Sequence, residues 1–188
     1  MTTALWLLAI QGVLGAFDTL YYHEWRARLP AAGRAARAEL VLHAARDFIY
    51  AVVFATLPRV EWHGAWALVF VALLVAEIVI TLKDFVVEDR VRRPLGGVYP
   101  GERVTHALMG ILYGAVLAHL APVLLSWWRE PTSLAARVES IPQLLLWLLT
   151  LMAVGVALSG ARDLYAALAL PGGGWPWETA EETVRREG

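Results

Sequence analysis

Two short stretches of this chain carry the same metal-ligand types in the same order. Residues 24–30 (EWRARLP) return as 88–94 (EDRVRRP), and each stretch begins with a glutamate. Residues 39–44 (ELVLHA) return as 102–107 (ERVTHA), and each of these contains Glu-x-x-x-His. Residues four apart share one face of a helix, so the Glu and His of each pair point the same way. Because carboxylates and imidazoles bind metal ions, the repeat predicts two related halves of one metal site.

Each predicted half supplies one lone glutamate and one Glu-x-x-x-His pair. The predicted ligands are Glu24, Glu39, His43, Glu88, Glu102 and His106. Carboxylate and imidazole ligands suit iron, manganese or zinc, and the absence of cysteine disfavours Cu(I) and iron–sulfur clusters.

This ligand pattern, which covers about residues 18–113, resembles that of the ferritin-like diiron-carboxylate bundles. In that family two helices give a glutamate each and two give Glu-x-x-His. The spacing here is one residue longer, although both spacings keep the two side chains on one helix face. The resemblance implies two metal ions, iron before manganese or zinc, and an oxidoreductase of the hydroxylase, desaturase or oxidase type.

Other polar residues near these motifs are alternative ligands or groups that orient and neutralise the ligands. They are Asp18, His23, Arg46, Asp47, Tyr50, Glu77, Asp84, Tyr113, Arg162 and Asp163. Tyr50 and Tyr113 each follow a predicted ligand histidine by seven residues and share its helix face two turns on. Either core packing or a hydrogen bond into the site would explain these tyrosines.

The composition indicates a multi-pass membrane protein. Of the 188 residues 59% are hydrophobic, and nine are Trp. The mean hydropathy is +0.54, well above that of ordinary soluble domains. A net charge of −1 argues against a nucleic-acid surface, and a chain without cysteine has no disulfide and no thiol nucleophile.

Hydropathy predicts an all-α polytopic bundle of five membrane spans in one domain, residues 1–170, followed by a flexible cytoplasmic tail, 171–188. The spans are approximately 4–23, 36–57, 63–86, 103–126 and 142–168. The repeated motifs indicate that residues 4–57 and 63–126 are two copies of one helix pair, which the fifth helix follows.

Basic residues favour the cytoplasmic side of a membrane. They are concentrated in the first and third connections, which orients the N-terminus outside and the C-terminus in the cytoplasm of a bacterial inner (plasma) membrane. The predicted ligands then lie together at the cytoplasmic ends of the spans. Each charge inside a bilayer costs about 2.5–3.5 kcal/mol on insertion scales, so these groups should face the bundle interior and one another.

Three functions remain open. The first is oxidation of a lipid, quinone or other apolar small molecule that enters from the bilayer. The second is electron transfer through a haem held between His43 and His106. The third is transport of a cation or proton by the acidic cluster. Gly110 and Gly114 permit close helix contact within the chain or in a homo-oligomer.

Overall fold

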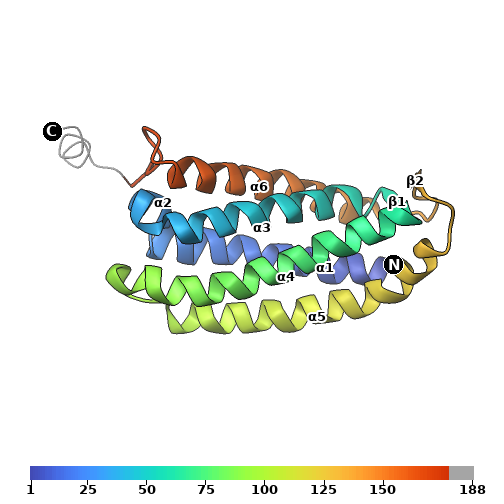
Figure 1. Cartoon of the computed structure of the whole chain (residues 1–188), viewed down its shortest axis with the longest axis horizontal. Helices are drawn as coiled ribbons and strands as arrows, with labels where there is room; N and C mark the ends of the chain where they lie inside the picture. The colour runs from blue at the N-terminus through green and yellow to red at the C-terminus, as the bar shows by residue number, and fades with distance from the viewer. Residues whose placement is uncertain (178–188) are drawn as a thin grey trace.

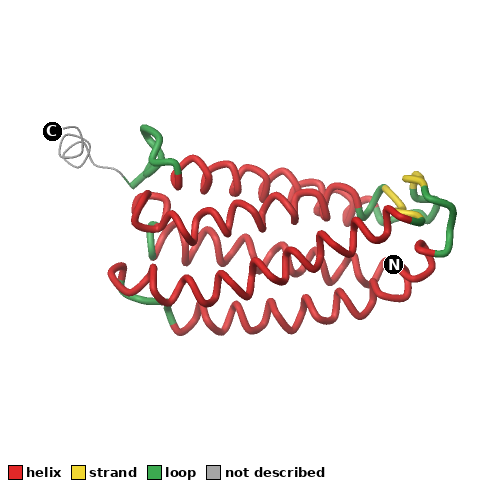
Figure 2. Tube along the Cα trace, in the orientation of Figure 1, coloured by secondary structure: helices red, strands yellow, loops and turns green. Residues whose placement is uncertain are grey.

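In the computed structural model, which describes residues 1–177, five long helices run side by side as one bundle (Figures 1 and 2). They are α1 (Thr2–Phe17), α3 (Arg37–Thr56), α4 (Ala65–Arg92), α5 (Pro100–Trp128) and α6 (Gln143–Ala167). The prediction of an all-α architecture with five long helices is confirmed.

Short elements join the helices at the two ends of the bundle. One end, called here the site end, holds the π-helix η1 (Asp18–Arg26), α2 (Leu29–Ala32), and the 3₁₀ helices η2 (Gly33–Ala36) and η3 (Arg93–Leu95). The other, called the β end, holds strands β1 (Val60–His63) and β2 (Ser133–Ala136), which pair antiparallel. The sequence did not predict this sheet, because its strands lie in two connections 70 or so residues apart and only the bundle brings them together.

Four helical segments are long and apolar enough to cross a membrane: Thr2–Arg26, Ala65–Leu95, Pro100–Trp128 and Gln143–Ala167. The predicted span at 36–57 is not among them. Its helix, α3, has 20 residues but carries Glu39, His43 and Asp47, which lower its hydropathy and are all buried. Since α3 packs along α4 and α6, its polar face is turned into the bundle.

The larger apolar cluster occupies the β half of the bundle, and the buried charges gather in the other half beside a smaller apolar cluster that includes Leu29, Leu40 and Ala166. α1 packs on α5, and α3 packs on α4. Core side chains such as Leu5, Phe70 and Leu149 are fully buried, whereas many large apolar residues such as Ile111 and Leu144 are exposed on the outer surface. An apolar exterior around a partly polar interior is typical of a membrane bundle.

The predicted tail at 171–188 lies only partly within the described residues. Residues 178–188 lie outside them. In the described part, the Trp175 carbonyl accepts a hydrogen bond from Arg162, and the Trp177 indole N–H donates to Glu24 over 3.4 Å. The segment 171–177 therefore contacts the site end.

Candidate metal centre

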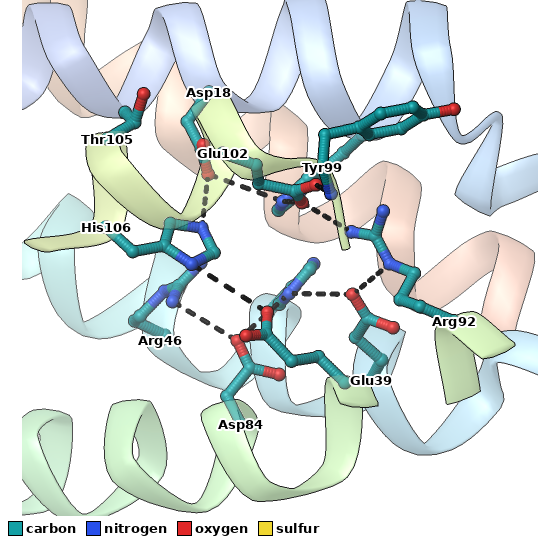
Figure 3. Close-up of polar contacts among 12 residues, drawn as sticks. Asp18, Glu39, Arg46, Asp84, Arg92, Tyr99, Glu102, Thr105 and His106 are labelled. Carbon is teal, nitrogen blue, oxygen red and sulfur yellow. Dashed lines mark hydrogen bonds and ion pairs between the residues drawn. The ribbon is translucent and has the colours of Figure 1, made fainter. Parts of the chain in front are cut away.

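Asp18, His23 and His106 form a compact group that could hold a metal ion. One ligand atom from each lies within 4.8 Å of the others. The Asp18 Oδ2 atom is 3.3 Å from His23 Nε2 and 3.1 Å from His106 Nε2. Asp18 is 2% exposed and His23 is 5% exposed, so bulk water competes little at this position. Figure 3 shows Asp18 and His106 pointing at one another from neighbouring helices.

The π-helix brings Asp18 and His23 to the same side of the chain. In an α-helix, residues five apart do not share a face, whereas π-helical turns are closed by i→i+5 hydrogen bonds. Asp18 opens η1, and His23 lies one π-turn further on. Because sequence periodicity assumes α-helical spacing, it treats these two residues as unrelated. The run Asp-x-x-x-x-His was visible in the sequence, but only a π-helix makes it a ligand pair.

A second group forms around His43. Its Nε2 atom is 3.1 Å from Asp84 Oδ2 and 3.8 Å from Glu39 Oε1, and its Nδ1 atom is 3.6 Å from Asp163 Oδ2. His43 is 3% exposed. The imidazole of His23 stacks on that of His43 with ring centroids 4.5 Å apart, so the two groups adjoin.

The rings of His43 and His106 are oriented in the same manner. Each directs Nε2 to an aspartate, Asp84 for His43 and Asp18 for His106, at 3.1 Å in both cases. Each directs Nδ1 to a second buried carboxylate, Asp163 at 3.6 Å for His43 and Glu88 at 3.8 Å for His106. Metal-binding histidines typically use one ring nitrogen for the ion and hold the other on a carboxylate, which fixes the tautomer and the ring orientation.

Arg92 joins the two predicted Glu-x-x-x-His motifs. Its Nε donates to Glu39 Oε1 over 2.7 Å, and its Nη2 lies 3.1 Å from Glu102 Oε1, with all three side chains fully buried (Figure 3). Glu102 also accepts a hydrogen bond from the Tyr99 backbone N–H over 3.2 Å, as part of a capping box at the start of α5. Arg92 was not among the predicted site residues, although it lies inside the repeated stretch 88–94.

The six predicted ligands therefore lie in different surroundings. His43 and His106 are in the two histidine groups, and Glu88 contacts His106. Glu39 and Glu102 share Arg92, while Glu102 Oε1 also lies 3.3 Å from His23 Nε2. Glu24 lies apart, paired with the Arg162 guanidinium through two hydrogen bonds.

Arg46 extends the His43 group, whereas Asp47 faces α6. Arg46 Nη1 lies 3.4 Å from Asp84 Oδ2. Asp47 packs where α3 meets α6, and a Cβ added to Gly160 would lie 3.0 Å from the Asp47 Cβ. The close approach of the two helices at Gly160 thus fixes Asp47 beside the site.

A further polar cluster lies toward the middle of the bundle, beyond the two histidine groups. The buried Glu77 accepts a hydrogen bond from Thr81 over 2.8 Å, and Tyr50 and Tyr113 both face its carboxylate. The two tyrosine rings meet with centroids 6.1 Å apart. The predicted alternatives Glu77, Tyr50 and Tyr113 thus share one cluster, separate from the group of Asp18, His23 and His106.

Several buried atoms of the centre have no hydrogen-bond partner among the described residues. The acceptor and imidazole atoms among them are Asp18 Oδ1, His23 Nε2, Glu39 Oε2, Asp84 Oδ1 and Glu102 Oε1, and the donors are Arg92 Nη1 and Nη2. His23 Nε2 is close to two carboxylate oxygens yet meets neither with hydrogen-bond geometry. Buried polar atoms are normally satisfied, and here carboxylates outnumber the arginines that could neutralise them. This donor set is suited to bound cations.

No protein-family model, curated protein or solved structure matches the chain. The assignment of the site therefore rests on its geometry.

Proposed function

We propose that this protein is an integral-membrane metalloprotein whose first metal ion is bound by Asp18, His23 and His106. The observation that carries the proposal is the separation of the donor atoms, 3.1 and 3.3 Å from the Asp18 oxygen to the two imidazole nitrogens. Ligands about 2.0–2.2 Å from one ion lie roughly 3.0–3.5 Å from each other. Two histidines and one carboxylate with further positions open are the donor set typical of non-haem Fe(II), so iron is the preferred metal.

A second ion fits beside His43, with Asp84 and Glu39 as its carboxylates. The matched 3.1 Å contacts, Asp18 with His106 and Asp84 with His43, support an internal repeat in which each half gives an aspartate to the other half's histidine. The shared Arg92 holds Glu39 and Glu102 near the centre and balances part of their charge.

We infer oxidoreductase activity on an apolar molecule that reaches the centre from the bilayer. An Fe(II) centre of this type supplies oxidation chemistry with dioxygen as oxidant, and an external donor supplies the electrons. His106 is the least buried of the three ligands and stacks on Phe85, whose ring is 37% exposed on the outer surface. An apolar chain lying against Phe85 would therefore approach the ion from the side of α4 and α5. The basic residues of the site end favour a cytoplasmic location for this end.

The direct test is metal analysis of the full chain purified from metal-replete cells. We expect about two equivalents of iron per chain, and His106→Gln should lose the first ion. His119→Gln is the matched control, since His119 is an exposed histidine of the same helix, outside the site. Less than one equivalent in the wild-type chain, or equal metal loss in both variants, overturns the proposal. If the wild-type chain contains only one equivalent of iron, the second ion alone is excluded.

A haem between His43 and His106 is less compatible with these contacts. The ring of His23 stacks on that of His43. Such a haem would have to displace Asp84 and Asp18, each 3.1 Å from an Nε2 atom, whereas a single ion can be bound by these carboxylates together with the imidazoles. A reduced-minus-oxidised spectrum of the same preparation tests this alternative, and an α band would establish haem in place of the metal pair.

Cation or proton transport is the second candidate, and Glu77 is the observation that favours it. A buried carboxylate in the middle of a membrane helix is costly and marks an ion or proton path by default. The cluster of Glu77, Tyr50 and Tyr113 continues the polar region toward the β end. The test is cation or proton flux into liposomes that contain the purified chain. If the wild-type chain binds no metal but carries a flux that Glu77→Gln abolishes, the protein is a transporter and not an enzyme.

A further inference from the structure

A basic groove lies on the outer surface of α3 and α4 at the site end. It has a volume of about 580 Å³ and is bordered by four cations, Arg34, Arg37, Lys83 and Arg90. Its apolar wall includes Ala38, Val41, Leu42 and Val87, and no carboxylate lines it. The groove is thus lined by positively charged and apolar side chains.

The four cations lack partners, unlike the other basic side chains of this end. All four are exposed, and none forms an ion pair with a carboxylate in residues 1–177. The remaining arginines of the site end each contact a carboxylate or an aromatic ring: Arg26, Arg28, Arg46, Arg92, Arg93, Arg103 and Arg162. Unpaired cations in a groove attract an anion, whereas the paired ones already have their counter-charge.

Exposed apolar side chains continue from the groove along the same two helices. On α4, Val79 is 58% exposed and lies one turn before Lys83. On α3, Val41 is 41% exposed and lies one turn after Arg37, and Phe48 continues this face. Arg34, Arg37 and Arg90 therefore lie near the end of the bundle and Lys83 lies about two turns before Arg90, while exposed apolar side chains continue one turn beyond Lys83 and Arg37. This order matches a lipid, whose charged headgroup lies at the interface above its acyl chains.

We propose that this groove binds the phosphodiester headgroup of an anionic membrane phospholipid, with its acyl chains lying along Val41 and Val79. Basic pockets between membrane helices on the cytoplasmic side are suited to such headgroups. The site is independent of the metal centre. Leu42 and Lys83 line the groove, whereas their neighbours His43 and Asp84 are buried in the bundle, so the α3–α4 pair separates the two sites.

The test is lipid titration of the purified full-length chain in neutral detergent, followed by native mass spectrometry. Phosphatidylglycerol should bind more tightly than phosphatidylcholine with the same acyl chains. Each cation near a membrane surface contributes about fivefold to binding, so Lys83→Gln/Arg90→Gln should weaken phosphatidylglycerol binding about 30-fold. The control, Arg93→Gln/Arg103→Gln, removes the same charge at the same end outside the groove and should change binding less than about threefold.

Three results would overturn the proposal. Equal binding of the two lipids would show that the headgroup charge is not recognised. An equal loss in the control variant would show that general surface charge, and not the groove, attracts the lipid. Full competition by inorganic phosphate at the lipid's concentration would identify a site for free phosphate. Lys83 and Arg90 have no partners in the described structure, and Arg93 and Arg103 form ion pairs only with the exposed Asp89 there. Circular dichroism should therefore show both double variants folded as the wild type.

Discussion

The His23 imidazole lies 3.3 Å from the Asp18 carboxylate, although the two residues are five positions apart along one continuous helix. That contact exists because the chain is π-helical from Asp18 to Arg26. It also brings His23 against His43, so one local change of helical period connects the two histidine groups. Long π-helical runs are rare and frequently occur at functional sites.

Loss of Arg92 should destabilise the bundle more than loss of any exposed arginine. Arg92→Met leaves Glu39 and Glu102 buried without their shared cation, which costs about 3–5 kcal/mol. Thermal unfolding in detergent, followed by circular dichroism, measures the effect. Arg93→Met is the control, because its side chain is 76% exposed and pairs only with Asp89 at the surface.

A rescue experiment separates charge from packing at this position. Glu39→Gln/Glu102→Gln in the Arg92→Met background removes the uncompensated charges and should restore much of the lost thermal stability. If the Arg92→Met chain unfolds at the wild-type temperature, the two ion pairs of Arg92 do not stabilise the bundle as proposed.

Asp163→Asn should weaken metal binding without unfolding the protein. The Asp163 carboxylate lies 3.6 Å from His43 Nδ1, where it would orient that ring for the proposed second ion. Loss of such an orienting carboxylate typically lowers metal affinity about 10–100-fold. Titration of the metal-stripped chain with Fe(II) under anaerobic conditions measures it, with the exposed Asp89→Asn as the control. Equal affinity in both variants would remove Asp163 from the site.

Metal affinity should fall as the pH is lowered. Metal-binding imidazoles must be neutral, and histidine titrates near pH 6.5 when unperturbed, so protons compete with the ion below about that pH. Binding should therefore release protons. Iron titrations between about pH 5.5 and 7.5, with proton release measured in weak buffer, test this direction. Affinity that does not change with pH would exclude histidine ligands.

Gly160→Ala should destabilise the contact between α3 and α6. The added Cβ would lie 3.0 Å from the Asp47 Cβ and 3.2 Å from the Ala44 carbonyl oxygen, so the helices must separate. Overpacking of this kind costs about 1–3 kcal/mol. Gly155→Ala is the matched control on the same helix, because its added Cβ meets no described atom within 4 Å. It should be neutral or stabilising by up to about 1 kcal/mol. Equal melting temperatures of the two variants would argue against the close contact.

The sequence by itself determined the apolar character of the long helices, their number and the end of the bundle at which the charges gather. These follow from composition and from the position of each polar residue along its own helix. Glu39 and His43 were correctly placed on one face for the same reason, because they are four residues apart on a regular α-helix.

The partners of each polar residue were decided only by the tertiary structure. The neighbour of a side chain depends on which helices pack together, and the pairing of α1 with α5 and of α3 with α4 brings Asp18 to His106 and Asp84 to His43. The pairing of Glu24 with Arg162 arises in the same way, because it depends on how α6 docks. The π-helix adds a local reason, because it changes the helical period between Asp18 and His23 and so brings these two side chains together.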